Sequence, residues 1–287
     1  MNPTHQLQVY WERVINRLLE QEEEDWLHKK VKGLTERGHR VERATFRLKP
    51  FHRIAYDLEE EVRYNLFLTL LIKDGRQVYM EEGIYDGVAH FKGADVVHHF
   101  IRTEVPVHSS LPPSPEFVNK ETQERAPFTY NRREAVRYAD RWWDSYNPAY
   151  RHFEVDCTNY ISQCLRAGGA PPWGIPNRSR GWWYSGKNWS YSWAVANSLR
   201  WYLSGSRQGL TAKEVSSPEQ LSPGDVICYD FEGDGRFDHN TMVVRKNSEG
   251  MPLVNAHTAN SRHRYWAYED STAYTPNIKY KFFIIGG

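Results

Sequence analysis

A segment rich in proline and serine, EVPVHSSLPPSPEF at 104–117, divides the chain into two regions with different hydrophobic patterns. Proline fixes φ and lacks a backbone N–H, so such a segment stays extended and joins folded parts. The 287 residues are enough for two ordinary domains. We therefore predict an N-terminal domain over 1–103, a linker over 104–127 and a C-terminal domain over 128–287.

The N-terminal region changes its hydrophobic period near residue 38. Apolar residues recur at helical spacing over 5–38, which predicts a helix that ends at Gly38. Apolar and polar residues then alternate, which predicts a β-meander with strands at 41–48, 62–73 and 77–84. Asp74-Gly75 lies between two of these strands and is typical of a hairpin turn. The region thus reads as a smaller α+β domain.

The C-terminal region places its helices before its strands. Helices are expected at 131–146, 157–167 and 192–203. Strands are expected at 226–229, 241–245, 252–257 and 279–285. This order is typical of an α+β fold in which helices pack on one antiparallel sheet.

The overall composition narrows the class of protein. The 37 basic residues nearly balance the 36 acidic ones, which argues against a nucleic-acid partner. No apolar run approaches the ~20 residues that span a bilayer, so membrane insertion is not expected. No secretory signal is visible and three cysteines do not form a disulfide framework, which favours a cytoplasmic location. A spore location or release by lysis stays open, as does the oligomeric state.

Cys157 stands directly behind Asp156 at the start of the predicted helix 157–167. A thiol attacks as its thiolate, and the N-terminus of a helix favours that form. The residues at +3, +4, +7 and +8 from Cys157 are apolar, so the thiol is expected at the rim of a core. The alternative is a small buried hydrophobic residue, which is the interpretation kept for Cys164 and Cys228.

A base for this thiol has to come from elsewhere in the chain. In FDHNTMVV at 237–244, His239 opens an apolar strand after an acidic turn, where an imidazole can face a helix tip. An ordinary turn histidine is the alternative. In the next strand, PLVNAHT at 252–258, Asn255 and His257 share one face. Either side chain could orient His239 across the antiparallel ladder.

Four segments in this order, DCTNYISQCLRAGG, LSPGDVICYD, DHNTMVV and PLVNAHT, resemble the "putative amidase domain" family. That family is placed in the NlpC/P60-type superfamily of papain-like cysteine peptidases and amidases. The resemblance runs from about Tyr130 to the C-terminus and implies a papain-like fold there. It also implies that Cys157 is the nucleophile and His239 the base. The resemblance leaves two candidates for the third member of the catalytic triad. The family's His-Thr signature selects His257, which is the assignment that we prefer. An alignment on the pattern of two apolar residues followed by a polar one selects Asn255.

This sequence departs from the usual entry to the Asp-Cys pair. A Gly-rich stretch is expected there, but the chain has the bulky sequence YNPAYRHFEVDC. The upstream contribution to an oxyanion hole is therefore open, and a hydroxyl of Tyr146 or Tyr150 is one candidate. The backbone N–H of Cys157 at the helix start is the firmer donor.

The resemblance implies a cysteine-dependent hydrolase that cleaves an amide or peptide bond through a thioester. Such chemistry requires no metal and no organic cofactor. A peptide or peptidoglycan-like molecule is the expected substrate. Two alternatives stay open, namely a non-catalytic peptide- or glycan-binding module on the same fold and an acyltransferase that uses the same triad.

Two further segments carry an open interpretation. DFEGDGRFD at 230–238 resembles a calcium loop but lacks the acidic residue at its twelfth position, so a tight acidic turn is the main interpretation. Five tryptophans follow the helix 157–167 and form either a packed loop or a groove wall over the substrate. They are Trp173, Trp182, Trp183, Trp189 and Trp193.

Overall fold

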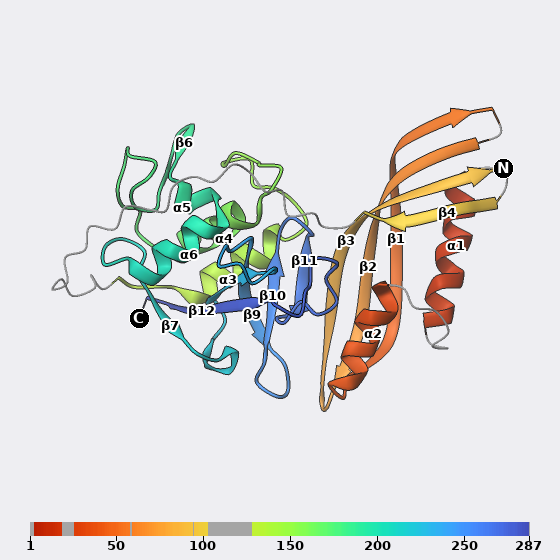
Figure 1. The fold of residues 1–287 in the computed structure, drawn as a ribbon. Helices are drawn as coiled ribbons and strands as arrows, with labels where there is room; N and C mark the ends of the chain where they lie inside the picture. Colours follow the sequence, from red (N-terminus) through yellow and green to blue (C-terminus); the bar gives the residue numbers. More distant parts are fainter. Residues whose placement is uncertain (1–2, 19–25, 58, 94, 103–127, 287) are drawn as a thin grey trace. The chain divides into compact units, whose positions relative to one another are not determined.

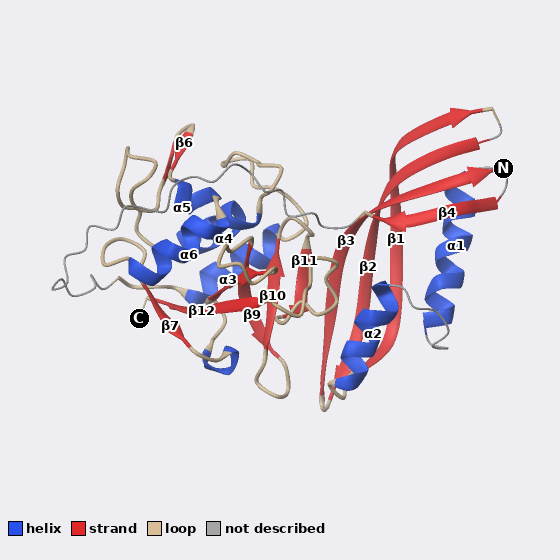
Figure 2. Ribbon diagram, in the orientation of Figure 1, coloured by secondary structure: helices blue, strands red, loops and turns tan. Residues whose placement is uncertain are grey.

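The structure, a computed structural model, describes residues 3–18, 26–57, 59–93, 95–102 and 128–286. Contacts between residues divide the chain into two compact units. The N-terminal unit is Met1–Glu104 with Tyr268–Thr272, and the C-terminal unit is Val105–Ala267 with Ala273–Gly287. The predicted linker at 104–127 lies outside the described residues. Helices and antiparallel strands occur together, which confirms the α+β class (Figure 2).

The N-terminal unit begins with two helices where one was expected. Helix α1 covers Pro3–Leu18 and helix α2 covers Trp26–Glu36, and residues 19–25 between them are not described. An antiparallel meander follows, and both helices pack on it (Figure 1). Its strands are β1 (Arg40–Tyr56), β2 (Glu59–Asp74), β3 (Gln77–Lys92) and β4 (Asp95–Ile101).

Strand alternation builds the core of this unit. Every second residue of β2 is buried, as in Leu66, Leu68 and Leu70, because successive side chains point to opposite faces. The hairpin between β2 and β3 is confirmed. Asp74 is the last paired residue and faces Gln77, so Gly75 and Arg76 form the loop that was expected at Asp74-Gly75.

The C-terminal unit packs helices against an antiparallel sheet (Figure 2). Its helices are α3 (Arg132–Trp142), α4 (Cys157–Ala167), α5 (Tyr191–Ala194) and α6 (Ala196–Gly205), with a 3-10 turn at Pro218–Gln220. The sheet runs in the order β11-β10-β9-β8-β12-β7. These strands are β7 (Ala212–Val215), β8 (Val226–Asp230), β9 (His239–Lys246), β10 (Pro252–Ala256), β11 (Ser261–Tyr265) and β12 (Lys279–Ile285). A short ribbon joins β5 (Tyr184–Ser185) to β6 (Asn188–Trp189).

Helix α4 carries the residues that matter most for function. It ends as predicted, because Gly168 and Gly169 follow it and Gly169 adopts φ 91°, a conformation that glycine tolerates best. A Cβ on Gly168 would lie 2.4 Å from the ring of Tyr130, so only glycine fits there. Ile161 and Cys164 are fully buried in the core between α4 and the sheet.

The sheet register decides which side chains face α4. Met242 of β9 and Cys228 of β8 belong to the core that α4 also enters. Cys228 pairs with Asn240, so Asn240 faces α4 as well. Residues adjacent to these along each strand point to the opposite face.

Asp225 holds the start of β8 in place through its side chain. Its buried carboxylate accepts hydrogen bonds from Arg132 Nη1 at 2.6 Å, Ile285 N at 2.9 Å and Ser222 N at 2.8 Å. These bonds connect α3, β12 and the turn before β8. Among the described residues, no helix is both long and apolar enough to cross a membrane.

Candidate active site

Cys157 is the first residue of α4, and its side chain is 2% exposed. Groups from three residues contact its Sγ atom. The hydroxyl of Thr158 lies 3.7 Å away, and the backbone N–H groups of Thr158 and Asn240 and the hydroxyl of Thr258 also hydrogen-bond to the sulfur. The tip of α4 therefore meets the start of β9 and the end of β10 at this sulfur.

The prediction of a thiol with a lowered pKa is not supported by this environment. Burial raises the pKa of the Cys157 thiol, and the hydrogen bonds from Thr158, Asn240 and Thr258 offset that effect only in part. The helix N-terminus favours a thiolate, but the two strands remove water from around the sulfur, and this desolvation favours the thiol. In this conformation the thiol is the favoured form of Cys157.

His239 opens β9 as predicted, but its side chain does not take the position that was expected. Asn240 is the residue that faces α4, because its Nδ2 donates to Thr158 Oγ1 at 2.9 Å. His239 precedes it in the strand and so points to the opposite face, where its ring packs against Tyr229 and Phe231. Its backbone nevertheless stays next to the N–H that contacts Cys157 Sγ.

The protonation of His239 follows from its burial. Burial lowers the pKa of His239 to about 3, and the positive charge of Arg264 acts in the same direction. The ring is therefore neutral at physiological pH. A neutral imidazole is the form that can accept a proton, but a pKa this low makes the buried ring a weak base.

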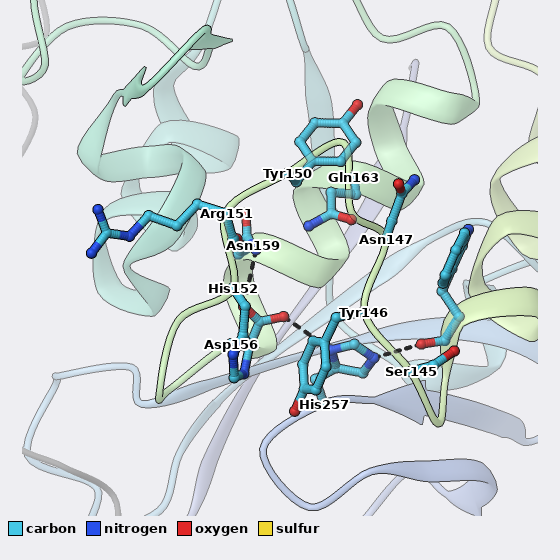
Figure 3. A pocket seen from close by; sticks show the side chains of 11 residues that line it. Ser145, Tyr146, Asn147, Tyr150, Arg151, His152, Asp156, Asn159, Gln163 and His257 are labelled. Atoms are coloured by element: carbon cyan, nitrogen blue, oxygen red, sulfur yellow. Dashed lines mark hydrogen bonds and ion pairs between the residues drawn. The ribbon is translucent and has the colours of Figure 1, made fainter.

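His257 lies directly after β10 and joins three parts of the unit (Figure 3). Its Nδ1 is 3.0 Å from Asp156 Oδ2, and its Nε2 is 2.7 Å from the carbonyl oxygen of Trp142 at the end of α3. Its ring also stacks on Tyr160 with the centroids 3.9 Å apart. His257 was expected to orient His239, but the partner that the structure gives it is Asp156.

Asp156 is the residue whose role the sequence analysis missed. It is buried and does not cap α4 with its side chain. Its Oδ1 accepts from Phe153 N at 3.0 Å and Asn159 Nδ2 at 2.9 Å, which leaves Oδ2 to His257. The Asp-Cys pair was a visible signal, but its spacing gave no indication of a partner about a hundred residues later.

Asn255, the other candidate for the third member, has different partners. It is fully buried in β10, and its Nδ2 donates to Asp140 Oδ1 of α3 at 3.2 Å. Its Oδ1 accepts from the backbone N–H of His263 at 2.9 Å. Asn255 pairs with Met242 and so lies on the face of the sheet that α4 covers, opposite to the ring of His239.

A pocket adjoins the pair formed by Asp156 and His257 (Figure 3). The space between the lining side chains, with the open solvent at its mouth included, is about 210 Å³, and its closed part has room for about one water molecule. The bulky stretch before the Asp-Cys pair supplies much of its wall, and Tyr146 and Tyr150 are both among the lining residues. Rings and neutral polar groups dominate this wall. Its other lining residues are Trp142, Ser145, Asn147, Arg151, His152, Asn159 and Gln163.

The acidic segment at 230–238 forms a tight turn. Asp230 accepts hydrogen bonds from the backbone N–H groups of Gly233, Asp234 and Gly235, so its carboxylate is engaged by the turn itself. Within the described ranges, no group of three or more His, Cys, Asp or Glu residues could hold a metal ion. The turn interpretation is therefore favoured over the calcium loop.

Asp238 gives this turn a measurable pH dependence. Burial raises the pKa of Asp238 to about 6, and Glu232 adds to the effect. The folded state then binds more protons than the unfolded state, so the free energy of unfolding falls as pH rises from about 4 to about 6. Asp238→Asn should remove this fall and raise the free energy of unfolding at pH 7.5 by about 1–2 kcal/mol. Chemical unfolding followed by tryptophan fluorescence measures both effects.

A control variant separates this effect from general charge removal. Glu249 is an exposed carboxylate in the turn between β9 and β10. Glu249→Gln is expected to change the free energy of unfolding by less than about 0.5 kcal/mol. Equal effects of the two substitutions would contradict the account of Asp238.

Three of the five tryptophans after α4 form a packed loop. Trp182, Trp183 and Trp193 are buried. Their indole N–H groups donate within the protein, to Ser162 Oγ, to the backbone carbonyls of Asn177 and Arg180, and to Asn159 Oδ1. The groove-wall interpretation therefore does not apply to these three.

The chain is similar to two proteins of Bacillus subtilis that are described as uncharacterized. The chain is 62% identical over 158 residues to the uncharacterized protein YhbB of Bacillus subtilis (strain 168), which covers 55% of this chain and 51% of that protein. It is 29% identical over 135 residues to the uncharacterized protein YjcM of the same organism, which covers 44% of this chain and 30% of that protein. The chain thus spans about half of the first of these relatives and less than a third of the second. No solved structure matches it, so the papain-like fold stays a prediction.

The family assignment rests on most of the C-terminal unit. The family described as "Putative amidase domain" matches residues 129–283, which is more than half of the chain. The name of this family suggests amide hydrolysis in general terms. Its match includes Asp156, Cys157, His239 and His257. The chain belongs to the "Putative amidase domain" family.

Proposed function

We propose that the C-terminal unit is a papain-like, cysteine-dependent amide hydrolase of NlpC/P60 type, with Cys157 as its nucleophile. The observation that supports this proposal is the environment of Cys157 Sγ. Hydrogen-bond donors of three residues, Thr158, Asn240 and Thr258, converge on this sulfur at a helix N-terminus. Donors of this kind stabilise a thiolate more than a thiol, because hydrogen bonds to a charged group are stronger.

His239 and His257 each stand directly before a residue that contacts the sulfur, namely Asn240 and Thr258. Only His239 suits the role of base. The Nδ1 atom of His257 faces the carboxyl group of Asp156, and its Nε2 atom faces the carbonyl oxygen of Trp142. Whether the shared proton lies on Nδ1 or on Asp156, the ring keeps no free lone pair for the thiol. His239 is neutral because burial lowers its pKa to about 3. We assign His239 as the general base, acting from a less buried position in which its pKa lies nearer to neutral, and His257 as the residue that holds Asp156.

The assignment of His239 requires a movement. Its ring packs against Tyr229 and Phe231 in this conformation. To accept the proton of Cys157, the start of β9 has to rearrange so that the His239 side chain comes to the face that α4 covers, because rotation about χ1 alone does not move a side chain across a sheet. Catalytic hydrogen bonds often form only when substrate is bound, so this requirement is compatible with the role. Asn255 then remains a structural link to Asp140 rather than the third member of a triad.

The chemistry proceeds in two steps. His239 takes the thiol proton, and the Cys157 thiolate attacks the amide carbonyl carbon to form a tetrahedral oxyanion. The C–N bond breaks, and protonated His239 transfers its proton to the leaving amine. Water then attacks the thioester and releases the acid. The backbone N–H of Cys157, the first residue of α4, is the proposed oxyanion donor.

The pocket beside Asp156 and His257 is the proposed subsite for the acyl side of the substrate. Its wall of tyrosine rings and neutral amides suits a peptide segment, for example a peptidoglycan stem peptide. Tyr146 packs on His257 with the ring centroids 5.1 Å apart, so a group in the pocket would lie close to the helix tip.

A binding module is the second candidate function. The observation that favours it is the raised pKa of the buried Cys157 thiol, which is typical of a packing cysteine. In that case the same pocket would bind a peptide without cleaving it. The two functions differ in whether removal of the sulfur abolishes a reaction or leaves binding unchanged.

Amine release from a panel of peptides and purified stem peptides distinguishes these functions. New amino groups, detected with fluorescamine, should appear with the wild-type protein and not with Cys157→Ala. Cys228→Ala is the matched control, because it removes a buried sulfur from β8 and should retain the reaction. Peptide binding that is equal in wild type and Cys157→Ala, with no amine released by either, supports the binding module instead.

A further inference from the structure

Thr158 occupies a distinctive position between Cys157 and β9. Its Oγ1 lies 3.7 Å from Cys157 Sγ and accepts a hydrogen bond from Asn240 Nδ2 at 2.9 Å. A hydroxyl that accepts through a lone pair keeps its own proton for a second partner. The geometry therefore lets the Thr158 hydroxyl donate to the sulfur.

The orientation of the Asn240 amide determines this donation. Asn240 is fully buried, and its Oδ1 has no hydrogen-bond partner among the described residues. With Nδ2 toward Thr158, the hydroxyl proton is directed away from the amide. With Oδ1 in the same place, the amide would accept that proton and withdraw it from the sulfur.

We propose that Thr158 is a positioning residue that stabilises the thiolate of Cys157 through its hydroxyl, with Asn240 fixing the direction of that hydroxyl. The inference rests on the proposed function of Cys157 as nucleophile. It goes beyond that function because it assigns two residues that act through the sulfur and do not touch the substrate. Removing the hydroxyl should make the thiolate harder to form without changing the fold.

Other charged or titratable groups near the sulfur stay in place in such a variant. They are Asp156 and His257 at the tip of α4, His239 at the start of β9 and Cys228 in β8. Burial raises the pKa of all three thiols, but the hydrogen bonds from Thr158, Asn240 and Thr258 offset this effect in part at Cys157, so Cys157 is the thiol expected to react first as pH rises. A difference between wild type and a Thr158 variant then reports on the hydroxyl alone.

The test is the pH dependence of Cys157 alkylation by iodoacetamide, read by peptide mass spectrometry. Thr158→Val removes the hydroxyl at nearly constant volume and should raise the midpoint by about one pH unit, a tenfold lower rate below the midpoint. Thr158→Ser keeps the hydroxyl and should restore the wild-type midpoint. Asn240→Asp places an acceptor beside the hydroxyl and should also raise the midpoint.

Thr241→Val is the control for loss of a buried hydroxyl. The hydroxyl of Thr241 in β9 forms a hydrogen bond of 3.1 Å with the hydroxyl of Tyr229. Removal of the Thr241 hydroxyl should therefore leave the midpoint of Cys157 alkylation unchanged. Equal midpoints in wild type, Thr158→Val and Thr241→Val overturn the inference. This readout uses no substrate, so it stays separate from the proposed function, which fails instead if Cys157→Ala retains amide hydrolysis.

Discussion

Replacing Cys157 with alanine should lower kcat/KM for amide hydrolysis by on the order of 10⁴-fold or more. The reason is that the proposed reaction passes through a thioester on this sulfur, and no other group at the tip of α4 can form one. The described residues hold two further cysteines, Cys164 and Cys228, but both are buried in the core between the helices and the sheet. Amine release under first-order conditions in substrate measures the effect.

The same substitution should leave the fold largely intact. Cys157 is small, and its loss costs on the order of 1–2 kcal/mol in the free energy of unfolding. A protein that unfolds at nearly the wild-type denaturant concentration and has lost activity identifies a chemical role for the sulfur. Activity within tenfold of wild type would contradict the assignment of Cys157.

Replacing His257 with alanine should lower the free energy of unfolding by about 3–5 kcal/mol. His257 and Asp156 are both nearly completely buried, with side chains 3% and 2% exposed, and they pair at 3.0 Å. Removal of the ring leaves the Asp156 carboxylate without that partner and the carbonyl of Trp142 without a donor. It also removes the ring that stacks on Tyr160.

His152 provides the comparison for this prediction. It lines the same pocket but is exposed, so His152→Ala should change the free energy of unfolding by less than about 0.5 kcal/mol. Urea unfolding of both variants at pH 7 measures the change in the free energy of unfolding for each. A loss below 1 kcal/mol for His257→Ala would show that the pair with Asp156 does not hold the helix tip.

Local patterns predicted much of the C-terminal unit. The predicted helix at 157–167 coincides with α4, because an apolar stripe and a Gly-Gly stop define both its face and its end. The strand predicted at 279–285 coincides with β12. Strands β7 and β11 were not predicted, since AKEV and SRHRY are short and largely polar and lack the alternation that marks a strand.

The candidate site could be predicted only in part. The order of the motifs brought the tip of α4, the start of β9 and the end of β10 together, and the three meet at Cys157 Sγ. Which face each histidine takes could not be read from the sequence, because a shift of one residue reverses every side chain in a strand. That uncertainty explains why Asn240, and not His239, faces Thr158.

The burial of Cys157 and the pairing of Asp156 with His257 could not be predicted from the sequence either. A helix N-terminus alone favours a thiolate, but the strands that cover Cys157 raise its pKa. The link between Asp156 and His257 joins residues far apart in the chain, and each has several possible partners in a linear reading. Such pairs become visible only when the packing of α4 on β10 is known.

The central claim, that Cys157 forms a thioester, is tested most directly with p-nitrophenyl acetate, an activated acyl donor that does not depend on the natural substrate. The account predicts a burst of nitrophenol close to one equivalent per protein, with the acetyl group located on Cys157 by peptide mass spectrometry, and no burst from Cys157→Ala. A burst of equal size from Cys157→Ala, or an acetyl group found only on other residues, would contradict it.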